Sequence, residues 1–169
     1  MIVVCDTSPL TALLTVGEEN LLPRIFDEVV IPEAVRDELL RNHARLPVWL
    51  RVASVRDAAQ AGKYAQLVDV GEAEAIELAL ELHADRLLID ERKGPKLAIQ
   101  EGVVVIGLLG VVLLAKRKML IPSARTLIER LHREAGMFWP QKSATPRSKL
   151  WAIRSQRVIE FHAPQLLFA

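Results

Sequence analysis

Residues 1–9 read Met-Ile-Val-Val-Cys-Asp-Thr-Ser-Pro, and this stretch decides the fold. Its first five residues form an apolar, β-branched run without the alternation of a half-exposed strand. Such a run predicts a strand buried on both faces, as in parallel sheets covered by helices. Thr7 or Ser8 is suited to cap a following helix, and Pro9 is suited to its first turn. The chain is therefore expected to begin with a buried strand that passes directly into a helix.

The same alternation of buried strand and helix continues along the chain. Further short, β-branched runs predict strands at 29–31, 51–55, 86–89 and 103–106. Capped or periodically apolar segments predict helices at 10–14, 20–26, 32–41, 57–67, 70–83, 93–101, 108–118 and 123–135. Strands that alternate with helices indicate an α/β fold, a three-layer α/β/α sandwich with a central, mostly parallel five-stranded sheet.

Length and composition limit the class of protein. The 169 residues suffice for about one domain, and 22 Lys and Arg against 21 Asp and Glu exclude a strongly basic coat for nucleic acid. Because Cys5 is the only cysteine, the chain cannot form an internal disulfide or a cysteine-based zinc site. The longest uncharged run, residues 102–115, is too short to span a bilayer. These features favour a reducing, cytoplasmic location without a membrane partner.

The character of the sequence changes near its C-terminus. Gly136 is predicted to end a domain of residues 1–136, because the apolar periodicity weakens after it. Residues 140–169 carry five basic residues and one acidic residue, Glu160, a net charge of +4. The extension 137–169 is compatible with an arm that binds nucleic acid, an arm that binds a partner protein, or a peripheral tail.

Acidic residues follow two of the predicted strands. Asp6 ends the first strand and Asp90 follows the strand 86–89. In a parallel sheet both would lie at the carboxyl-terminal edge, where functional groups of such folds collect. Each also has a structural explanation, since Asp6 is suited to cap the next turn and Asp90 to start a polar loop.

Two glutamates belong to helices that can reach the same edge. Glu38 lies within the helix 32–41, and its structural alternative is an exposed ion pair with Arg41 or Arg45. Glu72 lies in the first turn of the helix 70–83, where it would close a capping box with Asp69. Four carboxylates at one edge would repel one another and raise some of their pKa values. A hard dication such as Mg²⁺ or Mn²⁺ relieves that repulsion, orients water and stabilises charge on phosphoryl oxygens.

Five stretches in this order resemble a known family. They are residues 6–10, 31–39, 71–76, 87–91 and 102–116. Together they resemble a PIN domain over roughly residues 1–136, in particular a prokaryotic branch described as predicted nucleic-acid-binding proteins. The resemblance implies an α/β/α sandwich and a Mg²⁺- or Mn²⁺-dependent ribonuclease that acts on single-stranded RNA. It also implies the toxin of a toxin–antitoxin pair, with an antitoxin-like protein and a second copy of the chain as partners.

The resemblance assigns roles position by position. The acidic quartet that would hold the metal and serve catalysis is Asp6, Glu38, Glu72 and Asp90. Ser8 would support the first aspartate or a metal-bound water, and Glu91 and Glu74 have weaker claims. A basic rim for the flanking phosphates is predicted after Asp90, with Lys116–Lys118 as further candidates. The rim residues are Arg92, Lys93 and Lys96.

Two other functions remain open from the sequence. One is a phosphatase-type phosphotransferase resembling the haloacid dehalogenases, with Asp6 as a covalent nucleophile. That family expects a second aspartate two positions on, where this chain has Ser8. The other is a non-catalytic module that keeps the scaffold and binds nucleic acid or protein.

Overall fold

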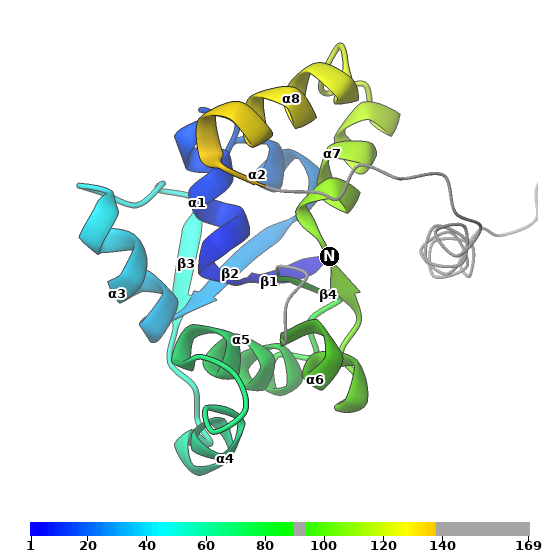
Figure 1. Ribbon diagram of the computed structural model, residues 1–169. Coiled ribbons are helices and arrows are strands. Elements are labelled where there is room, and N and C mark those ends of the chain that lie inside the picture. Colours follow the sequence, from blue (N-terminus) through cyan, green and yellow to red (C-terminus); the bar gives the residue numbers. More distant parts are fainter. Residues whose placement is uncertain (90–93, 138–169) are drawn as a thin grey trace, which may run out of the picture. The chain divides into compact units, whose positions relative to one another are not determined.

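The computed structural model describes residues 1–89 and 94–137, and these contain a five-stranded sheet (Figure 1). All strand pairs are parallel and the strand order is β3-β2-β1-β4-β5. The strands are β1 (Ile2–Cys5), β2 (Glu28–Pro32), β3 (Leu50–Ala53), β4 (Arg86–Leu88) and β5 (Val105–Ile106). The predicted α/β class and the five-stranded parallel sheet are therefore confirmed, each strand within a few residues of its expected place.

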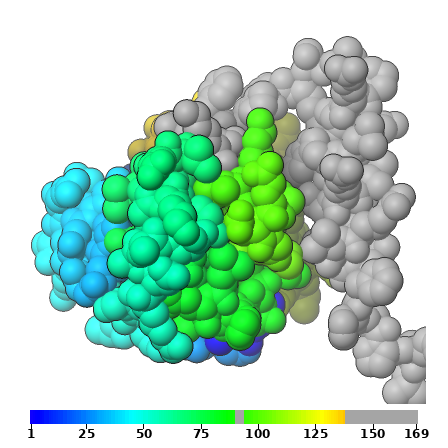
Figure 2. Space-filling model, turned by 90° about the horizontal axis from the view of Figure 1, so that it is seen from below, coloured from blue at the N-terminus to red at the C-terminus, as the bar shows by residue number. Residues whose placement is uncertain are grey.

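Helices cover both faces of the sheet. On one face lie α1 (Thr7–Thr15), α2 (Leu21–Ile25), α7 (Leu108–Arg117) and α8 (Ala124–Ala135) (Figure 1). On the other face lie α4 (Ala58–Tyr64), α5 (Val70–Glu81) and α6 (Gly94–Gln100), and Figure 2 looks onto this face. Helix α3 (Glu33–Asn42) contacts both α1 and α5, so it joins the two helical layers beside the sheet.

The burial of the strands explains why the sheet is parallel and central. Val3, Val4 and Cys5 of β1 are fully buried, and so is Leu88 of the neighbouring β4. A strand buried on both faces needs apolar side chains at consecutive positions, which is what residues 1–5 supply. In the register, Cys5 stands opposite Leu88, so β1 and β4 end side by side. The residues that follow them begin at the same edge of the sheet.

The start of α1 differs from the prediction. Its N-cap is Asp6, with extended backbone angles, and the helix begins at Thr7. Thr7 and Ser8 therefore lie inside the first turn and neither is the cap. The expectation was wrong because the buried strand ends at Cys5, which leaves a single residue to make the transition from strand to helix.

Other helix boundaries agree with the sequence signals. Asp57 caps α4 by accepting from the N–H of Gln60 at 2.8 Å, and Gly62 lies inside α4 without interrupting it. Ser123 caps α8 by accepting from the N–H of Thr126 at 3.2 Å. Gly136 follows α8 with φ of +65°, a left-handed conformation that glycine adopts at little cost. Within the described residues, none of the helices combines the length and apolar character that crossing a membrane requires.

Candidate functional site

Asp6 occupies the centre of the carboxyl-terminal edge of the sheet. It directly follows β1, and its backbone N–H donates to the carbonyl oxygen of Leu88 at the end of β4, at 2.8 Å. Its side chain is buried, with the residue only 4% exposed. A carboxylate in such a place is costly unless it is protonated or compensated, which marks Asp6 as a functional candidate rather than an ordinary cap.

The ionisation of Asp6 reflects its surroundings. Burial raises its pKa from 3.8 to about 7, because the carboxylate loses the water that stabilises its charge. The backbone N–H groups of Thr7 and Ser8 lower the pKa, whereas the negative charges of Asp69 and Glu72 raise it further. Near neutral pH, Asp6 is therefore divided between its charged and neutral forms. Asp69 and Glu72 are thus the carboxylates whose charges act on Asp6.

Glu72 comes to this edge at the start of α5. It is buried, with 7% exposure, and its backbone N–H donates to Oδ1 of Asp69, the N-cap of the helix, at 2.9 Å. This is the aspartate half of the predicted capping box. The carboxylate of Glu72 lies against Gly94, where an added Cβ would be 3.0 Å from Glu72 Cδ and Oε1. A side chain at position 94 would therefore push Glu72 out of place.

Glu38 reaches the same region from α3. It is exposed, and its Oε2 accepts a hydrogen bond from Thr7 Oγ1 at 2.7 Å. A Cβ built on Gly71 would be 3.5 Å from the same oxygen. The carboxylate of Glu38 thus lies between the first turns of α1 and α5. The exposed position of the structural alternative is confirmed, whereas its ion pair with Arg41 or Arg45 is not found within the described residues.

Four of the predicted residues lie outside the described part of the chain. They are Asp90, Glu91, Arg92 and Lys93. The residues on either side are described: Ile89 is 1% exposed, and its Cδ1 would be 2.4 Å from a Cβ on Gly94. Because Gly94 also borders Glu72, the two ends of this segment flank one member of the acidic group.

Several supporting residues have places that the sequence did not specify. Ser8 is exposed, and the hydroxyl that contacts an acidic residue is that of Thr7. Glu74 has a structural contact, since its Oε2 accepts from the N–H of Ala34 in the first turn of α3 at 3.0 Å. Lys96 is exposed near the start of α6.

The remaining basic candidates lie elsewhere. Lys116 Nζ donates to the carbonyl oxygen of Pro122 at 2.8 Å. The N-terminal ammonium group and, more weakly, Lys118 lower the pKa of Asp27. Since Asp27 donates its backbone N–H to Met1 at the start of β1, Lys118 lies near the edge of the sheet opposite Asp6. Lys118 is therefore poorly placed to hold a strand that approaches Asp6.

Two members of the site were missed as functional candidates. Asp69 was interpreted only as a helix cap, although its charge acts on Asp6. Thr7 was considered only as a cap, although its side chain faces Glu38. For Thr7, the one signal in the sequence was its position directly after Asp6. For Asp69 there was no signal, because a sequence does not distinguish an aspartate that only caps a helix from one that also faces a site.

The acidic group suits a hard cation in its chemistry. Among residues 1–89 and 94–137, no three His, Cys, Asp or Glu side chains are arranged to hold a metal ion together. Mg²⁺ is commonly bound through only one or two carboxylates, with water and substrate phosphate completing the shell. The buried carboxyl of Asp6, whose pKa neighbouring negative charges raise, is a donor that such a cation would stabilise in its charged form. The donors present therefore fit a divalent ion, without forming a complete protein cage.

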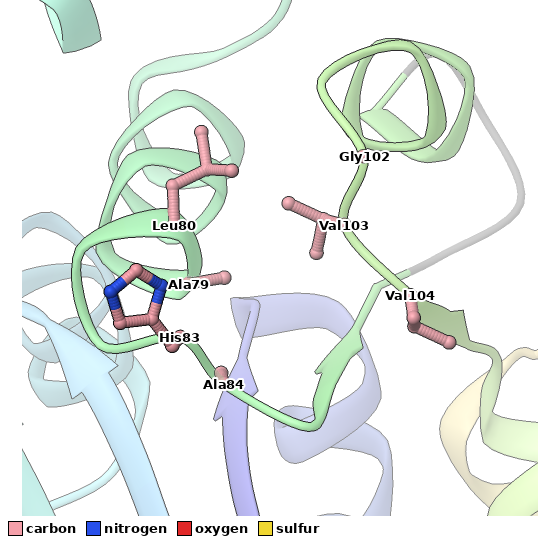
Figure 3. A pocket seen from close by; sticks show the side chains of 7 residues that line it. All are labelled: Ala79, Leu80, His83, Ala84, Gly102, Val103 and Val104. Carbon is pink, nitrogen blue, oxygen red and sulfur yellow. The ribbon is translucent and has the colours of Figure 1, made fainter.

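A pocket at the opposite edge is separate from this acidic group. It has a volume of about 260 Å³ and lies between the end of α5 and the residues that precede β4 and β5 (Figure 3). The side chains that line it are apolar except for the imidazole of His83. The lining residues are Ala79, Leu80, His83, Ala84, Gly102, Val103 and Val104. No carboxylate lines it, so the pocket offers none of the chemistry expected at Asp6.

Comparison with known proteins identifies the family. A family model described as a PIN domain matches residues 2–151. The chain belongs to the PIN domain family. PIN domains are typically metal-dependent nucleases, so a nuclease-type function with a nucleic-acid substrate is the general expectation for this chain. The haloacid dehalogenase-type alternative loses its basis, because the family is a different one.

The family match adds one detail to the domain organisation. It continues past residue 136, where the PIN domain was predicted to end, as far as residue 151. The boundary at 136 and the extension 137–169 stay predictions. No protein with a curated description matches the chain.

Proposed function

We propose that this PIN domain is a Mg²⁺- or Mn²⁺-dependent endoribonuclease that hydrolyses single-stranded RNA. The observation that supports it most is the buried carboxyl of Asp6 at the end of β1, whose pKa burial and the negative charges of Asp69 and Glu72 raise to about 7. What favours chemistry is the place of this carboxyl at the carboxyl-terminal edge of a parallel sheet, where the functional groups of such folds collect.

The proposed roles follow the resemblance and, for Asp6, Glu38 and Glu72, the place of each side chain. Asp6 and Asp90 would hold the ion, and Asp6 must lose its proton to do so. Glu38 and Glu72 would complete the acidic group and orient the attacking water. A bound Mg²⁺ or Mn²⁺ would supply a more acidic water and stabilise negative charge on the phosphate oxygens. The proposed substrate is single-stranded. A flexible strand can bend to bring one phosphate close to the acidic residues, whereas a rigid duplex is held away by their negative charge.

The basic residues are proposed to bind phosphates without reading sequence. Lys96 is exposed at the start of α6, close in the chain to Gly94, which borders Glu72. Arg92 and Lys93 are proposed for the same rim. Contacts of this kind position a strand and carry no base information. The toxin role, the antitoxin-like partner, the homodimer and the cytoplasmic location stay predictions from the sequence and the resemblance.

Cleavage of a mixed-sequence, single-stranded RNA in the presence of Mn²⁺ tests the proposal. The wild-type chain is compared with Asp6→Asn and with Asp27→Asn, an exposed aspartate at the opposite edge of the sheet. We expect Asp6→Asn to abolish cleavage and Asp27→Asn to retain it. Equal activity of all three proteins would refute the assignment, and Mn²⁺ binding without cleavage would favour the non-catalytic binding module.

A further inference from the structure

The side chain of Thr7 links two helices at the acidic edge. Thr7 is the first residue of α1, follows Asp6 directly, and is 8% exposed. Its Oγ1 donates to Glu38 Oε2 at 2.7 Å, across 31 positions of sequence. Because threonine is β-branched, its rotamer is restricted, and the direction of the hydroxyl is fixed by the helix that carries it.

Glu38 needs such a partner to be held in one place. It lies on an exposed face of α3, and a glutamate there has several rotamers of similar energy. The cation nearest in sequence, Arg36, is engaged by Asp37 at 2.8 Å and Glu33 at 3.4 Å. Within the described residues, the contact that orients the Glu38 carboxylate is therefore the Thr7 hydroxyl.

A hydroxyl is a suitable donor for a carboxylate that has to keep its charge. It contributes one hydrogen bond and no positive charge, so the carboxylate is oriented without being neutralised. Lysine or arginine in the same place would compete with a metal ion for the oxygens. On its other side, the Glu38 carboxylate faces the first turn of α5, where a Cβ added to Gly71 would be 3.5 Å from Glu38 Oε2 and 3.6 Å from Asp69 Oδ1.

We propose that Thr7 is a positioning residue, whose hydroxyl fixes the Glu38 carboxylate between the first turns of α1 and α5. The inference extends the proposed nuclease function and rests on it. The sequence suggested Ser8 as the residue whose hydroxyl supports the acidic group. The inference gives a supporting role to Thr7, whose hydroxyl binds Glu38.

Six variants of the full-length chain separate the hydroxyl from the shape of the side chain. Thr7→Val keeps the shape and removes the hydroxyl, whereas Thr7→Ser keeps the hydroxyl and removes the methyl group. Thr7→Ala is a second variant without hydroxyl, in case valine is not accommodated. Thr7→Val combined with Glu38→Gln completes a double-mutant cycle with the two single changes. Thr15→Val is the matched control on the same helix, because the Thr15 hydroxyl donates to the backbone carbonyl oxygen of Thr11 at 2.8 Å.

Two measurements are made on each protein. The first is the ¹³C resonance of the Glu38 side-chain carboxyl at constant pH 8 in metal-free buffer, identified by its loss in Glu38→Gln. The second is kcat and KM for single-stranded RNA with saturating Mn²⁺. We expect Thr7→Val and Thr7→Ala to shift the resonance and to lower kcat about tenfold with little change in KM, because a displaced group mainly affects the reacting geometry. Thr7→Ser and Thr15→Val should remain within about twofold of the wild type.

The outcomes distinguish this inference from the proposed function. In the Glu38→Gln background, Thr7→Val should have no further effect on kcat, and an undiminished effect would overturn the inference. It is equally overturned when Thr7→Ser is as impaired as Thr7→Val, or when the Glu38 resonance is unchanged in Thr7→Val. An inactive wild type with an intact resonance shift in Thr7→Val would instead reject the nuclease function and retain the Thr7–Glu38 contact.

Discussion

Helix α5 carries two buried glutamates that differ in their surroundings. Glu72 in its first turn and Glu77 in its middle are both 7% exposed. Glu72 lies beside Asp6 at the end of the central strand, whereas Glu77 faces α4 and the end of α6, the side of the molecule seen in Figure 2. Both are near other carboxylates, so burial and acidic neighbours alone do not separate them.

Glu77 and the three carboxylates that act on it form a second acidic group, and the hydrogen-bond partners of this group distinguish it from the site at Asp6. Its members are Glu77, Glu81, Asp57 and Glu101. Burial raises the pKa of Glu77, and Glu81, Asp57 and Glu101 raise it further. Glu81 accepts the backbone N–H groups of Arg56 and Asp57 at 2.8 and 2.9 Å, and Glu101 accepts from the hydroxyl of Tyr64 at 2.9 Å. These carboxylates hold a loop and a helix in place. The comparison teaches that acidic residues at strand ends are candidates for chemistry, while those between helices here serve packing.

The largest expected effect separates the two glutamates by activity. Glu72→Gln should lower RNA cleavage about a thousandfold, because it removes a charge from the acidic group at Asp6. Glu77→Gln, at equal burial on the same helix, should stay within about twofold of the wild type. Cleavage rates with Mn²⁺ at matched protein concentration decide between them. Comparable losses in both variants would mean that the second group also serves the reaction.

The next effect concerns the dependence of stability on pH. The pKa of Asp6 is about 7 in the folded chain and near 3.8 when unfolded, so the folded state keeps a proton that the unfolded state loses. The wild type therefore loses stability as pH rises from about 4 to about 7. Asp6→Asn cannot titrate, so at pH 8 it should exceed the wild type by up to roughly 4 kcal/mol, with little difference at pH 4.

Urea unfolding of both proteins in chelator-treated buffer at the two pH values measures this difference. Parallel stability curves for the two proteins from pH 4 to pH 8 would contradict the raised pKa of Asp6. Added Mn²⁺ should narrow the gap at pH 8, because a cation that binds the folded wild type stabilises it.

A smaller effect tests the contact between Glu72 and α6. In Gly94→Ala the added Cβ would be 2.4 Å from Ile89 Cδ1 and 3.0 Å from Glu72 Cδ, so these side chains must move. We expect a loss of about 2 kcal/mol in unfolding free energy and reduced cleavage. Gly62→Ala is the control, since Gly62 lies inside α4 with nothing within 4 Å of its added Cβ. It should gain about 0.5–1 kcal/mol, and a neutral Gly94→Ala would show that Glu72 is not confined there.

The smallest effect examines the packing role of the second acidic group. Tyr64→Phe removes the hydroxyl that donates to Glu101 at 2.9 Å and leaves the ring in the core. The expected loss of stability is about 1 kcal/mol, with cleavage unchanged. Thermal unfolding combined with the RNA assay checks both parts. A loss of cleavage without a loss of stability would assign this group a function that its contacts do not indicate.

The sequence predicted the strands well because their signal is local. The run at 1–5 is buried on both faces, as consecutive apolar β-branched residues require, and the signals at Asp57, Ser123 and Gly136 mark helix boundaries correctly. The start of α1 was less predictable, since Asp6, Thr7 and Ser8 are all acceptable caps and only the end of the buried strand selects the first.

The candidate site was predictable only in part. The positions of Asp6 and Glu72 followed from a strand end and a helix start, which the sequence marks. The partnership of Glu38 with Thr7, rather than with Arg41 or Arg45, depends on the packing of α3 against α1. The sequence predicted Asp69 as a helix cap. The effect of its charge on the pKa of Asp6 depends on how the chain folds, and sequence spacing does not predict it.

By itself the sequence determined which segments form strands and helices and where most of them begin and end. Secondary structure depends mainly on residues a few positions apart in the chain. The tertiary structure decided which carboxylates share an edge and which of them lack water. That outcome depends on the parallel register of β1 with β4 and on how α3 and α5 pack around the end of β1. Electrostatic interactions depend on distance and solvent access, and both are properties of the assembled sheet and helices rather than of any one segment.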